Sequence, residues 1–503
     1  MPPEEIENYV IEILSRSKTI QRRCRKLSAQ EFASESPRLL VKTISRICSY
    51  LEEAVLQVYR SIEWGKSFEE GIRADVSTLK YTDTFIRYLG EHLRYIDGAV
   101  TRKLPWSIIK PVEKLFQSIT PGILFMFRPQ WKYNYSIVTD DLRNFYFDSL
   151  EEFEDITERS REEVFEDLKG PFHIISFPSI ERKNILLHCL VGHELGHLIV
   201  GKYKFINEEL IKNFTKRIGL EVKKIIMERY HIHFSTLDMF KQFHAKQEVQ
   251  SSIETTQQIW KRGLEEILAD IIGTLIFGPS MLFSMYELSL QKKLDHIPGY
   301  SNSFYPAWRY RLRGIINILQ RHAASFFPIT PVYSPSNQIF KKVNERFELI
   351  KKLTLDKPDL EAIKKDALVE IAYREIEKDI DAFIKSTNYF KKELKKKILT
   401  PPKLYKDIEH LVKRIKNGLP PNAVENSIEK RRPAALVEII NAAWFYKISS
   451  NDKLLKEDGK INEEIFSKKE TLNRLTLKAI EYSDIETEYK NKTKKGLPGG
   501  KHK

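Results

Sequence analysis

Residues 193–197 read His193-Glu194-Leu195-Gly196-His197, and this stretch decides how the rest of the 503-residue chain is interpreted. Residues four apart on a helix lie on one face, so both imidazole rings can share a metal ion. Glu194 falls on the flank of that face, where its carboxylate can take a proton from a water molecule activated by the metal. The pentad therefore predicts a hydrolytic metal centre. Composition alone would produce such a pentad in roughly a few per cent of chains this long, so its surroundings must support it.

The surroundings of the pentad predict a buried helix preceded by a small sheet. Residues 184–200 are apolar at helical spacing, with a predicted stop at Gly201. Gly196 costs this helix about 1 kcal/mol relative to alanine, which indicates that another group approaches closely there. Three short runs with strand character come earlier in the chain: 123–127, 133–138 and 172–177 (FHIISF). An edge strand of such a sheet could hold an extended peptide by backbone pairing.

A zinc site needs a third protein ligand, and the sequence offers one on a second helix. The third histidine of the longer HExxH motif is absent, because Tyr203 stands at its position. The helical pattern over residues 251–277 carries Glu265, Glu266 and Asp270. Glu266 and Asp270 are four residues apart, so one can bind the metal while the other accepts the free ring N–H of a ligating histidine. Glu265 is the weaker candidate, since five residues separate it from Asp270.

On these residues the chain resembles the gluzincin zinc metallopeptidases, over about residues 172–315. In that family HExxH supplies two ligands and the base, and a downstream E-x-x-x-D helix supplies the third ligand and its supporting carboxylate. The resemblance implies that both histidines of the pentad and Glu266 bind Zn²⁺. It also implies that Glu194 acts as the general base and that Asp270 orients His193.

A further segment supplies candidates for stabilising the oxyanion. Residues 305–311 read YPAWRYR, which resembles the His-Pro with a following arginine found downstream in some membrane gluzincins, with tyrosine in place of the histidine. Tyr305 and Arg311 are therefore the remaining predicted catalytic residues. The alternative is ordinary turn packing with surface arginines.

The metal-site residues have structural alternatives as well. The two histidines could be satisfied by hydrogen bonds within a helix, and Glu266 and Asp270 could lie on a solvated helix face. The second alternative is weakened by the apolar residues between and beside the two carboxylates, because bare carboxylates are costly to bury. Cys189, one turn before the pentad, is expected to be a core residue rather than a ligand.

Shifts in composition predict four segments. Residues 1–100 and 326–485 show the 3.6-residue periodicity of helical domains, and 101–325 is the predicted zincin-like catalytic domain with a helical insertion at about 202–250. Residues 486–503 are expected to form a basic disordered tail. The predicted fold class is thus mainly α (α+β): a zincin-like core with a small β-sheet and the HExxH helix, flanked by helical N- and C-terminal domains.

Charge and cysteine content limit the location and partners. The net charge is +14, but the surplus gathers at 391–416 and 490–503, outside the predicted catalytic domain. This favours a solvated face and a solubilising tail over nucleic-acid binding. Three scattered cysteines indicate a reducing compartment. Without a secretory signal or an apolar run of about 18 residues, we expect a cytoplasmic protein with no membrane partner.

The predicted function is that of a zinc metallopeptidase that hydrolyses peptide bonds in a protein or peptide substrate, with Zn²⁺ as cofactor and Glu194 as base. One alternative is a non-catalytic regulatory or interaction protein with the zincin fold, although a scaffold would not need Glu194. The other is a basic helical nucleic-acid-binding protein in which the pentad is incidental. The sequence predicts neither the oligomeric state nor the cleavage preference.

Overall fold

The structure is a computed structural model of the chain. The described residues are 3–62, 71–138, 141–229, 239–290, 294, 306–322, 338–355, 366–385, 405–425, 431–450, 454–456, 458 and 460–496. They form two compact units, Met1–Lys183 and Asn184–Lys503, and each is described by itself. The described chain is mainly helical with two small sheets, so the mainly α prediction is confirmed.

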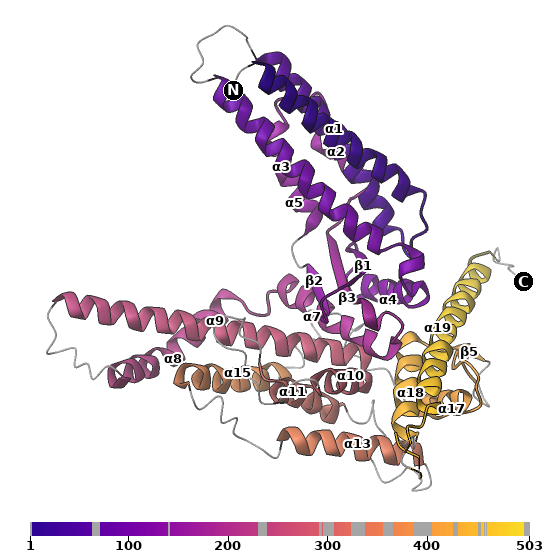
Figure 1. Cartoon of the computed structure of the whole chain (residues 1–503). Coiled ribbons are helices and arrows are strands. Elements are labelled where there is room, and N and C mark those ends of the chain that lie inside the picture. Colours follow the sequence, from indigo (N-terminus) through magenta and orange to yellow (C-terminus); the bar gives the residue numbers. More distant parts are fainter. Residues whose placement is uncertain are drawn as a thin grey trace, which may run out of the picture. The chain divides into compact units, whose positions relative to one another are not determined.

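The first unit is built on three long helices that pack on one another, α1 (Pro3–Ser28), α2 (Ser36–Ser61) and α3 (Gly71–Gly98) (Figure 1). The apolar periodicity of the sequence explains this packing. On α2, for example, Leu40, Ile44, Ile47 and Leu51 recur at steps of three and four residues and are all completely buried. Shorter elements complete the unit: η1 (Thr101–Lys103), α4 (Trp106–Ile119), α5 (Leu142–Ser149), η2 (Glu151–Phe153), α6 (Arg161–Val164) and η3 (Ser179–Glu181).

The three predicted strands form one sheet in this unit. They are β1 (Leu124–Gln130), β2 (Ser136–Val138) and β3 (Phe172–Pro178), in the order β1-β3-β2. β1 runs parallel to β3, whereas β2 is antiparallel to it. Every residue of the central strand β3 is buried, including the polar His173 and Ser176 among its apolar residues.

The second unit is almost entirely helical, and its second element carries the pentad. Its elements are η4 (Ile185–Leu190), α7 (Val191–Lys202), α8 (Glu208–Arg229), α9 (Met239–Phe277), α10 (Pro279–Ser289), α11 (Trp308–Arg321), α13 (Gln338–Leu355), α15 (Ala367–Lys385), α17 (Tyr405–Lys416), β4 (Ala423–Val424), β5 (Arg432–Pro433), α18 (Leu436–Ser449) and α19 (Glu464–Gly496). The long helix α9 is central, since α7, α8, α11 and α15 all pack against it (Figure 1). α8 and the first part of α9 occupy the region of the predicted helical insertion.

The close approach predicted at Gly196 occurs where α7 crosses α9. A methyl group at Gly196 would lie 2.6 Å from the Cα and the carbonyl oxygen of Ala269 on α9. Gly273 on α9 is also close to α7, because a methyl group added to it would lie 3.0 Å from the backbone nitrogen of His193. Glycine is therefore what lets the two backbones meet, and this contact sets the side chains of the pentad against those of α9.

Two local predictions need correction. The helix expected from residue 184 begins as the 3₁₀ segment η4 and becomes α-helical only at Val191. The tail expected to be disordered from residue 486 is helical up to Gly496, as part of α19, and an ion pair of 2.9 Å between Glu486 and Lys490 spans one turn of it. Residues 497–503 lie outside the described residues. Among the described helices, none has the length and hydropathy to cross a membrane.

Candidate metal centre

Helices α7 and α9 bring the predicted metal ligands together. His193 and His197 lie one turn apart on α7, and their Nε2 atoms are 3.0 Å from each other. The Glu266 carboxylate on α9 lies 3.4 Å from Nε2 of His193 and 3.5 Å from Nε2 of His197. In a tetrahedral site with zinc–ligand distances near 2.0–2.1 Å, neighbouring ligand atoms are about 3.3 Å apart. The three side chains are thus arranged as a group that could hold a metal ion.

The outer nitrogen of each histidine is bound by a carboxylate from α9. Nδ1 of His193 lies 2.7 Å from Asp270, as the sequence predicts, and Nδ1 of His197 lies 3.1 Å from Glu265. When each Nδ1 carries the proton that its carboxylate accepts, both Nε2 atoms present lone pairs to each other across 3.0 Å. Two facing lone pairs repel, so this arrangement favours a positive charge between them, either a proton or a metal ion.

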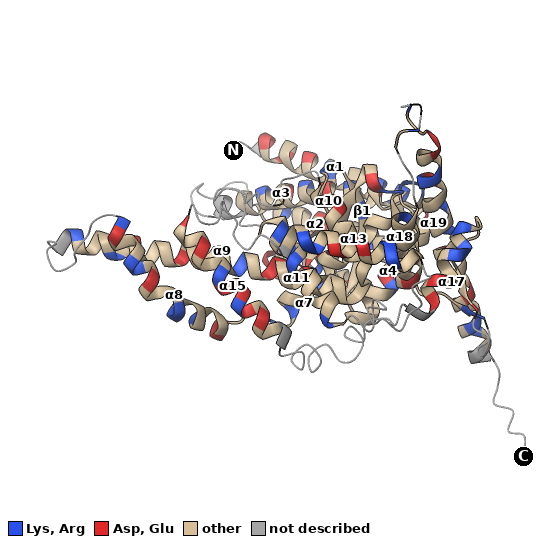
Figure 2. Ribbon diagram, turned by 90° about the horizontal axis from the view of Figure 1, so that it is seen from below, with Lys and Arg blue, Asp and Glu red and all other residues tan. Residues whose placement is uncertain are grey.

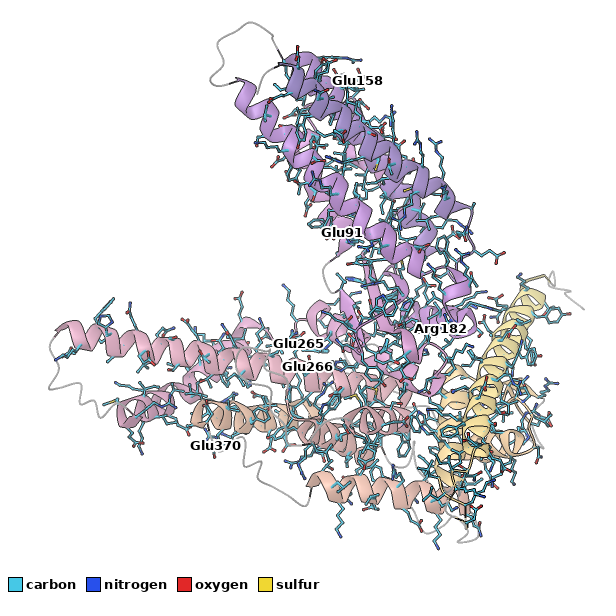
Figure 3. The ribbon with its side chains drawn as sticks, viewed as in Figure 1. Glu91, Glu158, Arg182, Glu265, Glu266 and Glu370 are labelled. Carbon is cyan, nitrogen blue, oxygen red and sulfur yellow. The ribbon has the colours of Figure 1, made fainter. Side chains whose placement is uncertain are left out.

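Glu265 is the residue whose position the sequence interpretation missed. Sequence spacing ranked it below Glu266 as a ligand, but it serves neither as a ligand nor as a surface residue. It accepts from His197 and lies 3.4 Å from the guanidinium of Arg262. Figure 3 labels Glu265 and Glu266 together on α9. The available signal was the need for two orienting carboxylates, because two histidines require two such partners.

Arg311 on α11 is buried and lies beside two of the carboxylates of α9, those of Asp270 and Glu266. Its Nε and Nη2 atoms donate to the two oxygens of Asp270 at 2.7 and 2.8 Å, and Nη1 lies 3.5 Å from Glu266. The guanidinium also lies over the Trp308 ring, 4.9 Å from its centroid. The structure thus brings Arg311 to the site, where Asp270 is its main partner and Nη2 also lies 3.4 Å from both ring nitrogens of His193.

The rest of the 305–311 segment is packing. Tyr305 lies outside the described residues. Arg309 and Tyr310 are buried and donate to the backbone carbonyls of Leu353 and Tyr373. The packing role expected in the alternative therefore holds for Arg309 and Tyr310, although they lie in the helix α11 and not in a turn. The alternative also expected surface arginines, but both Arg309 and Arg311 are buried.

The alternative of a solvated face is wrong for the two acidic residues, because Glu266 is 1% exposed and Asp270 0%. Burial raises the pKa of Glu266, but Arg311 and the histidines outweigh burial and lower that pKa to about 2. Burial likewise raises the pKa of Asp270, and Arg311 with His193 outweighs it, holding the pKa well below its ordinary value. For His193, burial lowers the pKa, yet Asp270 and Glu266 raise it to about 10. The site therefore contains ionised carboxylates that attract positive charge.

Two further observations bear on what the site can do. Glu266 Oε2 is buried and accepts no hydrogen bond from any described residue, as expected of an oxygen intended for a metal. Glu194 is also buried on α7, and burial raises the pKa of its carboxyl above the ordinary value. A raised carboxyl pKa suits a group that must accept and then return a proton near neutral pH.

Cys189 belongs to the core rather than to the site. Its thiol is buried and lies 2.9 Å from the Ser284 hydroxyl, which confirms the expectation of a structural cysteine. Across the described ranges, the two histidines with Glu266 form the one group of three or more His, Cys, Asp or Glu side chains that could hold a metal ion.

Comparisons with known proteins leave the function to be argued from these residues. No protein-family model matches the chain, and neither a curated protein nor a solved structure matches it.

Proposed function

We propose that this protein is a zinc-dependent metallopeptidase that hydrolyses peptide bonds. One observation carries the proposal: two Nε2 atoms and a carboxylate converge at 3.0–3.5 Å, and both outer histidine nitrogens are held by further carboxylates. Carboxylates bound to the outer nitrogens of histidines are typical of zinc sites. The gluzincin resemblance of the sequence agrees with this arrangement.

The ligand types favour zinc and a catalytic rather than a structural site. Two imidazoles and one carboxylate are a borderline nitrogen and oxygen set that Zn²⁺ accepts readily. Structural zinc sites use four protein ligands, most often with cysteine, whereas three ligands leave one position for water or substrate. The group of three found here fits the second type.

Bound zinc would supply Lewis-acid polarisation of the scissile carbonyl and acidify a water molecule. His193, His197 and Glu266 would hold the ion. Glu194 would take the proton from the attacking water and deliver it to the leaving amine, and its buried environment favours both transfers. Arg311 is the weaker candidate for an oxyanion donor, because its Nε and Nη2 donate to Asp270 and its Nη1 lies beside Glu266. Tyr305 remains the predicted donor.

The two alternatives have less support. A non-catalytic scaffold leaves the cost of burying Glu194 without a purpose. Along α8, α9 and α15, Lys and Arg alternate with Asp and Glu (Figure 2), so these helices do not form the continuous basic surface that nucleic acid requires. We also propose a protein or peptide as substrate, in keeping with the proposed peptidase activity. A cytoplasmic location is proposed because all three cysteines are free and buried, as is usual in a reducing compartment.

Metal content is the first test of the proposal. Plasma mass spectrometry of the purified protein should find about one zinc per chain in the wild type and almost none in Glu266→Ala. The matched control is Glu209→Gln, a change of an exposed residue on α8, and it should keep the wild-type zinc content. Wild-type protein that takes up no zinc after incubation with the ion would contradict the proposal.

Glu194→Gln tests the chemistry separately from the metal. Glutamine has the same shape but cannot accept the proton, so the variant should keep its zinc and its melting temperature. Hydrolysis of an unstructured protein such as casein or of a peptide library should fall at least about 100-fold. Equal hydrolysis by the variant and the wild type would show that Glu194 is not the base.

A further inference from the structure

We propose that Arg311 is a positioning residue, which fixes Asp270 and Glu266 and thereby keeps His193 and the third ligand ready for the metal. The inference rests on the proposed metal site and deepens it. It replaces the sequence-based expectation that Arg311 contacts the oxyanion. Three features of the structure support it. Arg311 forms a fork of two hydrogen bonds to the Asp270 carboxylate, it lies beside a second buried carboxylate, that of Glu266, and its guanidinium lies over the Trp308 ring.

The fork is a contact that only arginine can make. Nε and Nη2 donate to opposite oxygens of the same Asp270 carboxylate, at 2.7 and 2.8 Å, and so fix both its position and its rotation. The same Asp270 oxygen that receives Nη2 lies 2.7 Å from Nδ1 of His193. Arg311 therefore sets the orientation of the His193 ring mainly through Asp270, and its Nη2 also lies 3.4 Å from both ring nitrogens of His193. A lysine ammonium would keep the charge but lose this geometry.

The gathering of carboxylates explains why a cation is needed at this point. Glu266 and Asp270 share one face of α9 and are both buried, with Glu265 also beside the histidines. Ionised carboxylates this close repel one another in a medium of low dielectric constant. Arg311 lies against both Asp270 and Glu266, with Nη1 3.5 Å from the latter. Without it, we expect the two carboxylates to move apart and the ligand group to lose its shape.

The ring of Trp308 helps to keep the arginine in place. The guanidinium carbon lies 4.9 Å from the ring centroid, within the range of a cation–π contact. Because Trp308 is the first residue of α11 and Arg311 lies one turn later, the two side chains share one face of that helix. Trp308 and the two carboxylates thus surround the guanidinium.

The test compares Arg311→Gln and Arg311→Lys with Arg313→Gln. Arg313 lies on the same helix but donates to Glu377 and the Thr354 carbonyl, away from the site. Zinc affinity is measured by competition with a chromophoric chelator, and the coordination geometry by the visible absorption spectrum of the Co²⁺-loaded protein. Arg311→Gln should weaken zinc binding about 10- to 100-fold, as does loss of other residues that support metal ligands.

The spectrum separates positioning from a general loss of stability. Arg311→Gln should change the position and intensity of the Co²⁺ bands, because the ligands adopt a different arrangement. Arg311→Lys should recover part of the affinity without the wild-type spectrum. Arg313→Gln should match the wild type in both measurements. Wild-type affinity and spectrum in Arg311→Gln would overturn the inference, while the metal site would stand.

A double variant covers the risk that Arg311→Gln does not fold. Asp270→Asn with Arg311→Gln removes opposite charges together, so no buried charge of this pair is left alone. Because Arg311 lies against Glu266 as well as Asp270, the double variant should bind zinc more weakly than Asp270→Asn alone, but by less than the product of the two separate losses. A loss equal to the product of the two separate losses, or no loss at all, would contradict the inference. Wild-type protein that binds neither ion would overturn the metal site itself.

Discussion

The behaviour of a buried residue here depends on its partners rather than on burial alone. His92 on α3 and His193 on α7 are both buried, yet their pKa values shift in opposite directions. Burial among aromatic rings lowers the pKa of His92 to about 4, and the positive charge of Arg128 lowers it further, while a hydrogen bond with the Tyr88 backbone opposes the shift. Burial also lowers the pKa of His193, but Asp270 and Glu266 raise it to about 10. A histidine beside carboxylates is prepared to share positive charge, and His92 is not.

His92 should make the first unit sensitive to acid. Its pKa is lower in the folded than in the unfolded chain, where it is near 6.5, so the unfolded state binds the proton first as the pH falls. Its contribution is complete above pH 6.5 and is lost as the pH falls towards 4, amounting to about 3 kcal/mol at most. Urea unfolding at several pH values should show this loss in the wild type. His92→Phe keeps the aromatic contacts, and its unfolding free energy should fall less between pH 6.5 and 4. Parallel curves of unfolding free energy against pH for the variant and the wild type would contradict the prediction.

Within the site, spacing predicted pairs of residues on one helix but not their contacts with other helices. The four-residue intervals of His193 with His197 and of Glu266 with Asp270 were sufficient to predict a shared face for each pair. The attachment of Arg311 to Asp270 joins residues 41 positions apart, and the contact of Glu265 with His197 joins residues 68 apart. No local periodicity contains such contacts. The ligands were therefore predictable and their supporting residues only in part.

At the level of elements, apolar runs and helical spacing predicted which elements form better than where they begin. The three strands lie within a few residues of their predicted positions, and the pentad helix forms as predicted but starts seven residues late, at 191 instead of 184. The late start of α7 has a tertiary cause, since the Leu186 carbonyl accepts from Ser284 and from the indole of Trp444. α9 begins at Met239 rather than 251, in a polar stretch whose pattern is weak but which packs with α8. These causes lie far away in the sequence.

The crossing of α7 and α9 predicts a strong effect of one methyl group. In Gly196→Ala the added methyl carbon would lie 2.6 Å from backbone atoms of Ala269. Backbone atoms cannot rotate out of the way as a flexible side chain could. We expect a loss of about 1–3 kcal/mol in unfolding free energy despite the gain in helix propensity. Zinc affinity should fall at least 10-fold, because the histidines and Glu266 move apart.

Gly201→Ala is the matched control for the crossing, because it lies on the same helix with nothing within 4 Å of the added methyl group. It should be neutral or stabilise the protein by up to about 1 kcal/mol, with unchanged zinc affinity. Chemical denaturation and chelator competition measure both quantities. Two alanine variants that behave alike would show that the helices do not depend on the close approach at Gly196.

At the scale of the whole chain, composition predicted a mainly helical protein but not which segments share a core. The structure groups the end of the predicted catalytic domain, from residue 184 on, with the predicted C-terminal helical domain in one compact unit. One reason is Asn441 on α18, which donates to the Phe277 carbonyl and accepts from the backbone N–H of Ser280. These two bonds tie a C-terminal helix to the end of α9. A buried asparagine in an apolar helix gives no sign of its partner in the sequence.

The division into two units predicts that metal removal acts on only one of them. A metal that binds the folded second unit and not the unfolded chain stabilises that unit by about 4 kcal/mol at a thousandfold excess over the dissociation constant. Hydrogen exchange followed by mass spectrometry should therefore show faster exchange in α7, α9 and α11 after treatment with a strong zinc chelator. Exchange in α1, α2 and α3 should be unchanged.

Two controls distinguish loss of the metal from other effects of the chelator. Added zinc should restore slow exchange in α7, α9 and α11, because the ligand group reforms around the ion. Glu266→Ala should exchange quickly in these helices with or without chelator, since it lacks the third ligand. The same increase in α1–α3 would mean that the chelator acts on the whole chain. If chelator treatment did not speed up exchange in α7, α9 and α11 of the wild type, the prediction would be wrong. The packing of α7 on α9 and the contacts of Arg311 would then hold the ligand group without a metal.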